Sequence, residues 1–203
     1  TANREIPAGK ISAGAALVFV VVNVVAFVII TWFLNELCFY LSFVAMFVVL
    51  GYSLTKRFTW MCHFILGVGL SLAPIGAFLA VSGVFELAPV MLSVAVFLWV
   101  AGFDIIYAMQ DEHFDRERGL FSVPAFFGGK SALALSRILH LISFTFIVLV
   151  GIKIDASWLY YVGTLIFGSM LFYQHMLVRV DDLSRVNLAF FTTNGIASVV
   201  YAT

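Results

Sequence analysis

Seven long apolar runs constrain the fold of this chain more than any other feature. A helix needs about 20 predominantly apolar residues to cross the hydrocarbon core of a bilayer. Each run is close to that length, although the last is short. The runs lack the alternating pattern of membrane barrel strands. We therefore predict an all-α fold, a polytopic transmembrane helical bundle with spans at residues 11–31, 37–55, 60–82, 87–109, 131–151, 157–178 and 186–203.

The composition supports an integral membrane protein in contact with lipid. Hydrophobic residues make up 63% of the chain, charged residues 11%, and the mean hydropathy is +1.09. The 11 basic and 11 acidic side chains balance, so the chain offers no basic surface for nucleic acid. Gly-x-Ser-x-Gly, Walker-type and His-Glu-x-x-His motifs are absent from the sequence, so hydrolase and zinc protease activities have no support.

The positions of the basic residues predict the orientation in the membrane. With seven spans, Lys153 falls on one side of the membrane, and all the other basic residues fall on the opposite side. Such an asymmetry marks the cytoplasmic face, so we expect the charged connections to face the cytoplasm, in a bacterial inner membrane. The ten residues on that side are Arg4, Lys10, Lys56, Arg57, Arg116, Arg118, Lys130, Arg137, Arg179 and Arg185.

A cluster of carboxylates follows the fourth span, and five of the 11 acids fall between residues 104 and 117. At about 100° per residue, Asp104, Tyr107, Asp111 and Asp115 point into a sector of roughly 80° on a helix. Carboxylates four residues apart suit a hard cation such as Mg²⁺, with phosphate oxygens filling the remaining positions. The alternative is a solvated loop in which nearby arginines pair with the acids.

Two further groups of polar residues lie near the ends of spans. Lys56 and Arg57 close the second span on the same side as the acids, where they suit a ligand with several phosphate oxygens. Alternatively, they are snorkelling cations that mark the membrane interface. His63, His140 and His175 lack the spacing of metal ligands, and we expect them to form structural hydrogen bonds.

The two ends of the sequence predict a piece of a longer protein. The chain starts at Thr1 without an initiator methionine, and it stops inside an apolar stretch. We expect residues 1–203 to form a single transmembrane domain that is truncated at the N-terminus and at the C-terminus.

Several ordered motifs resemble those of the UbiA superfamily of intramembrane aromatic prenyltransferases. The resemblance covers essentially the whole chain and is closest to the 4-hydroxybenzoate polyprenyltransferase branch. It implies a fold of nine helices, of which the seven spans are helices three to nine. The matching segments are Asn3-Arg4-x-Ile6-Pro7-x-Gly9-x-Ile11-Ser12, Tyr52-x-x-x-Lys56, Tyr107-Ala-x-x-Asp111-x-x-x-Asp115-x-x-x-Gly119-x-x-Ser122, Phe127-Gly128 and Asn187-x-Ala-Phe-Phe-x-x-Asn194-Gly195.

The resemblance implies Mg²⁺-dependent transfer of a polyprenyl group from polyprenyl pyrophosphate to a hydroxylated aromatic acid, in quinone biosynthesis. The family's first aspartate-rich motif lies outside the chain, so the fragment alone is expected to be inactive. Asp111 and Asp115 are expected to bind the metal, and Asp104 or Asp115 to act as a base or supporting acid. Tyr107 is expected to orient the substrate or a ligand carboxylate. The expected substrate contacts are Arg4, Lys56, Arg57, Asn187 and Asn194.

Three alternatives remain open from the sequence. A naphthoate-type acceptor would place the reaction in menaquinone biosynthesis instead. A transporter or channel could use the acids to bind a cation, although transporter sites usually lie near the membrane midplane. A non-catalytic membrane subunit derived from such an enzyme is the third alternative.

Overall fold

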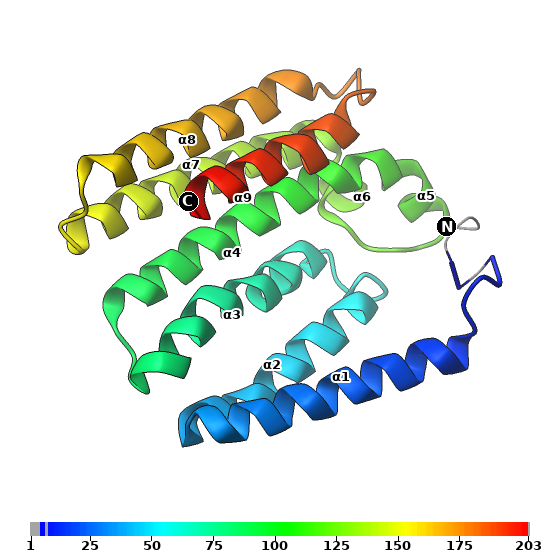
Figure 1. The fold of residues 1–203 in the computed structure, drawn as a ribbon. Helices are drawn as coiled ribbons and strands as arrows, with labels where there is room; N and C mark the ends of the chain where they lie inside the picture. Colours follow the sequence, from blue (N-terminus) through cyan, green and yellow to red (C-terminus); the bar gives the residue numbers. More distant parts are fainter. Residues whose placement is uncertain (1–4, 7, 203) are drawn as a thin grey trace.

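The computed structural model describes residues 5–6 and 8–202, and within them the regular structure is helical (Figure 1). The only β pairing in this part of the chain is an isolated bridge between Arg179 and Asp182. The all-α prediction is therefore confirmed. The elements are α1 (Ala13–Leu34), α2 (Glu36–Thr55), α3 (Cys62–Ser82), α4 (Leu87–Ala108), the 3₁₀ turn η1 (Met109–Asp111), α5 (Glu112–Glu117), α6 (Val123–Phe127), α7 (Gly129–Lys153), α8 (Trp158–Leu177), the π-helical segment η2 (Leu188–Thr193) and α9 (Asn194–Ala202).

Five helices are long and apolar enough to cross a membrane among the residues described, and they correspond to α1, α2, α3, α4 with its extension, and α7. These helices confirm five of the seven predicted spans in type and position. Helix α8 is 20 residues long, but its tyrosines, Gln174 and His175 reduce its apolar character. The last apolar segment, Leu188–Val199, is shorter than a full span. The total of seven spans therefore stays a prediction.

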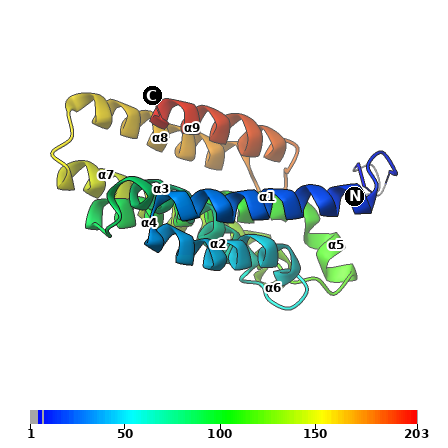
Figure 2. The same cartoon turned by 60° about the horizontal axis from the view of Figure 1, so that its bottom comes forward.

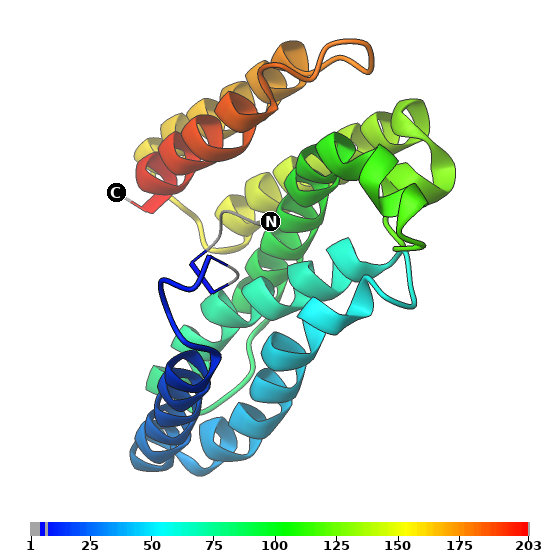
Figure 3. The ribbon, with the colours of Figure 1, turned by 90° about the vertical axis from the view of Figure 1, so that its right-hand side faces the viewer.

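The helices form layers around a central pair (Figures 2 and 3). Helices α4 and α7 pack along each other, α3 packs against α4, and α8 and α9 cover the opposite side. Two serines of α7 tighten the central pair, because Ser136 Oγ donates to Gly102 O and Ser143 Oγ donates to Ala95 O, both at 2.7 Å. Small and hydroxylated residues at a helix interface allow this close approach within a membrane.

Short connections join the helices at one end of the bundle. Asn35 adopts an extended conformation that ends α1 and begins α2. Its Oδ1 accepts from the Cys38 N–H at 2.9 Å, and its Nδ2 donates to Leu79 O at 2.8 Å, which ties this turn to the last turns of α3. Gly83 ends α3 with a φ of 68°, a left-handed conformation that favours glycine.

The longer and charged connections lie together at the other end of the bundle, where residues 8–12, α5 and α6 are found (Figure 1). The α2–α3 connection and residues 178–187 lie at this same end, because successive long helices run in opposite directions. Lys153 closes α7 at the far end. Among the described residues, Lys153 is thus separated from the other basic residues as the sequence predicts, and Arg4 lies outside the described residues.

We predict that Gly67→Ala destabilises the bundle. A Cβ at this position of α3 would lie 2.7 Å from the backbone oxygen of Phe97 in α4, so α3 and α4 must move apart. Overpacking of this kind costs about 1–3 kcal/mol. Thermal unfolding of the purified protein in detergent measures the loss. Gly76→Ala in the same helix is the control, because nothing lies within 4 Å of its Cβ position. Equal midpoints for the two variants would contradict the α3–α4 packing.

Candidate active site

The acidic segment does not continue α4 as one straight helix. Helix α4 ends at Ala108, the 3₁₀ turn Met109–Asp111 follows, and α5 begins at Glu112. The tighter 3₁₀ turn changes the direction in which later side chains point. Asp104 and Asp115, expected on one helical stripe, consequently have separate partners. One arginine pair that the alternative of a solvated loop expects is present, because Arg116 Nη2 lies 2.8 Å from Glu112 Oε1.

Asp115 is the buried centre of the cluster, with none of its surface exposed. Its Oδ1 lies 2.9 Å from the Lys56 ammonium, and its Oδ2 accepts a hydrogen bond from Ser122 Oγ at 2.9 Å. The same ammonium lies 4.0 Å from Oδ2 of Asp111, whose side chain is 52% exposed. Lys56 therefore lies close to both acids, although it comes from the end of a different helix, α2.

A short segment, Phe121 to Val123, fixes this arrangement by binding the α2–α3 connection. The Phe121 N–H donates to Lys56 O at 2.8 Å, and the Cys62 thiol contacts Phe121 O at 3.6 Å. The Val123 N–H donates to His63 Nε2 at 3.2 Å. Because Ser122 at the centre of the segment binds Asp115, these contacts fix the position of Lys56 relative to Asp115.

His63 links Asp104 to the same segment. Its Nε2 accepts the Val123 N–H, so in a neutral imidazole its Nδ1 carries the proton and donates to Asp104 Oδ2 at 2.6 Å. The Asp104 side chain is 23% exposed, and one of its carboxylate oxygens is thus held by the imidazole. The sequence predicts a structural hydrogen bond for His63 but gives no sign that its partner is Asp104, 41 residues away.

Tyr107 packs against the π-helical segment η2, with ring centroids 4.3 Å from Phe190 and 6.3 Å from Phe191. These contacts bring the last helical segment to the end of α4. Asn187 precedes η2 and is exposed, whereas Asn194 follows it, and its buried Nδ2 has no hydrogen-bond partner within the described chain. The wider π turns between them separate their directions, so a spacing of seven residues does not align them as in an α-helix.

Arg57, another predicted substrate contact, takes no part in the ion pairs found in the described part of the chain. It follows Lys56 directly and is exposed. Arg4 lies outside the described residues. The structure therefore joins Lys56, Asp111 and Asp115 at one place, and it joins Asp104 to them indirectly through His63 and residues 121–123.

The chemistry of these donors fits part of a magnesium site. Asp111 is half-exposed, and Asp115 Oδ1 has no hydrogen-bond partner, although it faces the Lys56 ammonium. Carboxylate oxygens are the ligands Mg²⁺ prefers, and it commonly takes only one or two of them beside water and phosphate oxygens. Within residues 5–6 and 8–202, no group of three or more His, Cys, Asp or Glu side chains is arranged to hold a metal.

The sequence matches one family model over nearly its whole length. The model described as the UbiA prenyltransferase family matches residues 1–196. The chain belongs to the UbiA prenyltransferase family. The resemblance noted in the sequence motifs is thereby confirmed, and the membrane helices described above are those of an integral membrane protein of this family.

Two curated relatives and two solved structures are similar to this chain. It is 29% identical to a 4-hydroxybenzoate octaprenyltransferase of Tolumonas auensis and 34% identical to one of Alcanivorax borkumensis, over 100% and 90% of its length. It spans 70% and 62% of those proteins. An apo UbiA homologue of Aeropyrum pernix superposes with a TM-score of 0.90 at 28% identity, covering 99% of this chain and 74% of that one. A digeranylgeranylglyceryl phosphate synthase structure shares the fold with a TM-score of 0.75 at 19% identity, covering 98% and 72%.

We predict that Lys56→Met destabilises the protein, because it leaves the buried Asp115 carboxylate without its cation. An unsatisfied buried group costs about 1–3 kcal/mol, and more when it is charged. Thermal unfolding in detergent measures this loss. In the Asp115→Asn background the same lysine substitution is expected to cost much less, since no buried charge remains. Lys130→Met serves as the control, because Lys130 is exposed at the same end of the bundle. Equal losses in both backgrounds would contradict the pairing.

Proposed function

We propose that this chain is the larger part of an enzyme that transfers a polyprenyl group from polyprenyl pyrophosphate to 4-hydroxybenzoate, in ubiquinone biosynthesis. Two similar proteins of known name are 4-hydroxybenzoate octaprenyltransferases. The observation that carries the proposal is the Lys56 ammonium beside Asp111 and the buried Asp115. A cation placed against carboxylates suits a ligand that brings both phosphate oxygens and a divalent metal ion.

The proposed binding step uses the three side chains together. Asp111 and Asp115 would hold Mg²⁺, which when bound supplies positive charge to the pyrophosphate leaving group. Lys56 turns its ammonium from Asp115 toward a phosphate oxygen, and Arg57, exposed beside it, provides a second cation. These charges stabilise the pyrophosphate as the bond between the allylic carbon and oxygen breaks. The stabilisation that these charges provide is greatest in the transition state, where negative charge develops on the leaving oxygen.

The proposed second step joins the allylic carbon to the aromatic ring, which must then lose a proton. Asp104 is our candidate base, with Asp115 as the other carboxylate in reach of the cluster. His63 donates to one oxygen of Asp104 and so leaves the other as the acceptor. Tyr107, packed between α4 and η2, would orient the acceptor or a ligand carboxylate. Asn187 and Asn194 stay proposed substrate contacts, and so does Arg4, which lies outside the described residues.

The remaining metal ligands are proposed to come from a segment that precedes Thr1. Residues 1–203 would then form helices three to nine of one transmembrane domain, and this chain alone would be inactive. The site would open to the cytoplasm, in a bacterial inner membrane, with the isoprenoid tail toward lipid. The position of the acids at one end of the bundle, rather than at its middle, favours this enzyme over a cation transporter.

We predict that Asp111→Ala in the full-length protein abolishes Mg²⁺-dependent prenylation without unfolding it. Asp111 is half-exposed, so its loss removes a metal ligand but no core packing. Formation of prenylated product in membranes is the measurement, with thermal unfolding as the test of folding. Asp181→Ala is the control, since Asp181 is 74% exposed in the α8–α9 connection. Unchanged turnover by Asp111→Ala would reject the metal-ligand assignment.

The acceptor is tested with the full-length protein and two substrates. Purified protein is given polyprenyl pyrophosphate, Mg²⁺ and either 4-hydroxybenzoate or a hydroxynaphthoate, and prenylated products are separated by mass. We expect product with 4-hydroxybenzoate. Product with the naphthoate alone would assign the protein to menaquinone biosynthesis instead. The absence of product with either acceptor would favour a non-catalytic role.

A further inference from the structure

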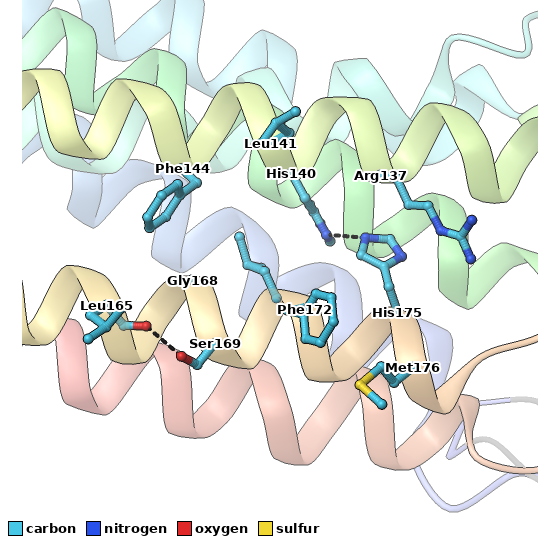
Figure 4. Close-up of a pocket in the computed structure, with 11 residues that line it drawn as sticks. Arg137, His140, Leu141, Phe144, Leu165, Gly168, Ser169, Phe172, His175 and Met176 are labelled. Carbon is cyan, nitrogen blue, oxygen red and sulfur yellow. Dashed lines mark hydrogen bonds between the residues drawn. The ribbon is translucent and has the colours of Figure 1, made fainter.

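A groove of about 630 Å³ lies between α7 and α8 (Figure 4). Its walls are mainly apolar, and Leu141, Leu165 and Phe172 in them are each about two-thirds exposed, at 67%, 67% and 68%. Charged and imidazole side chains are found toward one end of the groove only, where Arg137 and His175 lie. This polar end belongs to the start of α7 and the end of α8, which is the charged end of the bundle.

Two histidines at this end form a hydrogen-bonded chain across three helices. His140 Nε2 lies 3.2 Å from the carbonyl oxygen of Trp99 in α4, and a carbonyl only accepts, so this nitrogen carries the proton. In a neutral imidazole the other nitrogen, Nδ1, then accepts from His175 Nε2 at 2.9 Å. The second imidazole therefore presents a bare Nδ1, and this buried nitrogen has no hydrogen-bond partner.

The position of the first histidine ring is fixed by packing. A Cβ on Gly102 would overlap ring atoms of His140, so the ring occupies space that only a glycine in α4 leaves free. The hydrogen-bonded pair of His140 and His175 is thus held against the central helices α4 and α7. His140 is therefore held in place by α4, and its Nδ1 stays available to bind His175 Nε2.

Arg137 supplies a cation without an ion-pair partner in the described residues. It lies two turns into α7 and is exposed. Figure 4 shows its guanidinium beside the His175 ring, on the side away from His140. A cation within a membrane span is costly without an anionic partner or access to the interface. This end of the groove therefore offers Arg137 as a cation for an anionic group and His175 Nδ1 as a hydrogen-bond acceptor for a donor.

We propose that this groove binds one anionic phospholipid whose headgroup carries a hydroxyl, such as phosphatidylglycerol. The phosphate pairs with Arg137, a headgroup hydroxyl donates to His175 Nδ1, and an acyl chain lies along the apolar walls toward Phe144 and Leu165. Phe144 lies seven residues beyond Arg137, about 10 Å along the helix axis. The charged end of the groove would face the headgroups and its apolar walls the acyl chains of the leaflet at the charged end of the bundle.

Charge and exposure favour a lipid over other occupants. The apolar walls are open on their outer side, where a bilayer would bring acyl chains into contact with them. A soluble anion would satisfy the arginine but leave those walls uncovered. A packed apolar helix would cover the walls but supply no anion. The site is separate from Lys56 and Asp115, which lie at the end of α2 and in α5, so the inference is independent of the proposed reaction.

The test counts lipids bound to the full-length protein by native mass spectrometry, with three probes of equal chain length. Phosphatidylglycerol has the anion and the hydroxyl, phosphatidylmethanol has the anion alone, and phosphatidylcholine has neither a net charge nor a donor. We expect the parent protein to bind them in that order of decreasing affinity. Arg137→Gln should weaken phosphatidylglycerol binding roughly tenfold, the loss expected for one charge-assisted hydrogen bond. Arg137→Lys should retain most of it.

The second variant tests the imidazole separately. His175→Phe should remove the preference for phosphatidylglycerol over phosphatidylmethanol, while the preference for both over phosphatidylcholine remains. Arg179→Gln is the matched control, because this arginine is 73% exposed at the same end of the bundle and lies outside the groove. Equal binding of all three lipids by the parent, or unchanged phosphatidylglycerol binding by Arg137→Gln, would overturn the proposal.

Discussion

The buried carboxylate of Asp115 is the constraint on which the charged end of the molecule depends. A carboxylate with no exposed surface is tolerated only when a cation and hydrogen bonds compensate its lost hydration. The chain meets this need with Lys56 from the end of α2 and with Ser122 from the start of α6. One acid thus determines where three separate segments meet, and it does so at the place where the proposed pyrophosphate would bind.

Two histidine arrangements show how the structure treats polar groups among membrane helices. Both nitrogens of His63 have partners, Asp104 and the Val123 N–H, and this imidazole is a complete structural link between the two parts of the candidate site. The pair formed by His140 and His175 is incomplete, because one nitrogen of His175 stays buried without a partner. Because water is scarce among such helices, a buried nitrogen without a partner needs an explanation, and for His175 the proposed lipid headgroup supplies one.

Much of the fold could be predicted from the sequence, because the signal for a membrane helix is local. The runs that became α1, α2, α3, α4 and α7 needed only length and hydropathy, and the distribution of arginine and lysine gave the charged end. Helix α8 is harder to predict as a membrane span, since its tyrosines and Gln174 lower its hydropathy. The topology placed Lys56 on the same side of the membrane as Asp111 and Asp115, but spacing cannot relate two distant segments closely enough to predict their contact.

The parts that sequence reasoning missed depend on contacts between distant residues or on departures from α-helical geometry. The 3₁₀ turn at residues 109–111 broke the expected stripe of Asp104, Tyr107, Asp111 and Asp115, and the π turns of η2 separated Asn187 from Asn194. The bond between His63 and Asp104 joins α3 to α4, and a single histidine in an apolar run gives no indication of its partner. Such features are fixed by tertiary packing, which propensity and periodicity do not describe.

The central claim is that Lys56, Asp111 and Asp115 form one side of a site for a metal-bound pyrophosphate. A structure of the full-length protein with Mg²⁺ and a non-hydrolysable polyprenyl pyrophosphate analogue tests it most directly. The account predicts metal coordinated by Asp111 and Asp115, and the Lys56 ammonium moved from Asp115 to a phosphate oxygen. A pyrophosphate bound elsewhere, with the Lys56–Asp115 ion pair intact and no metal beside Asp111, would contradict it.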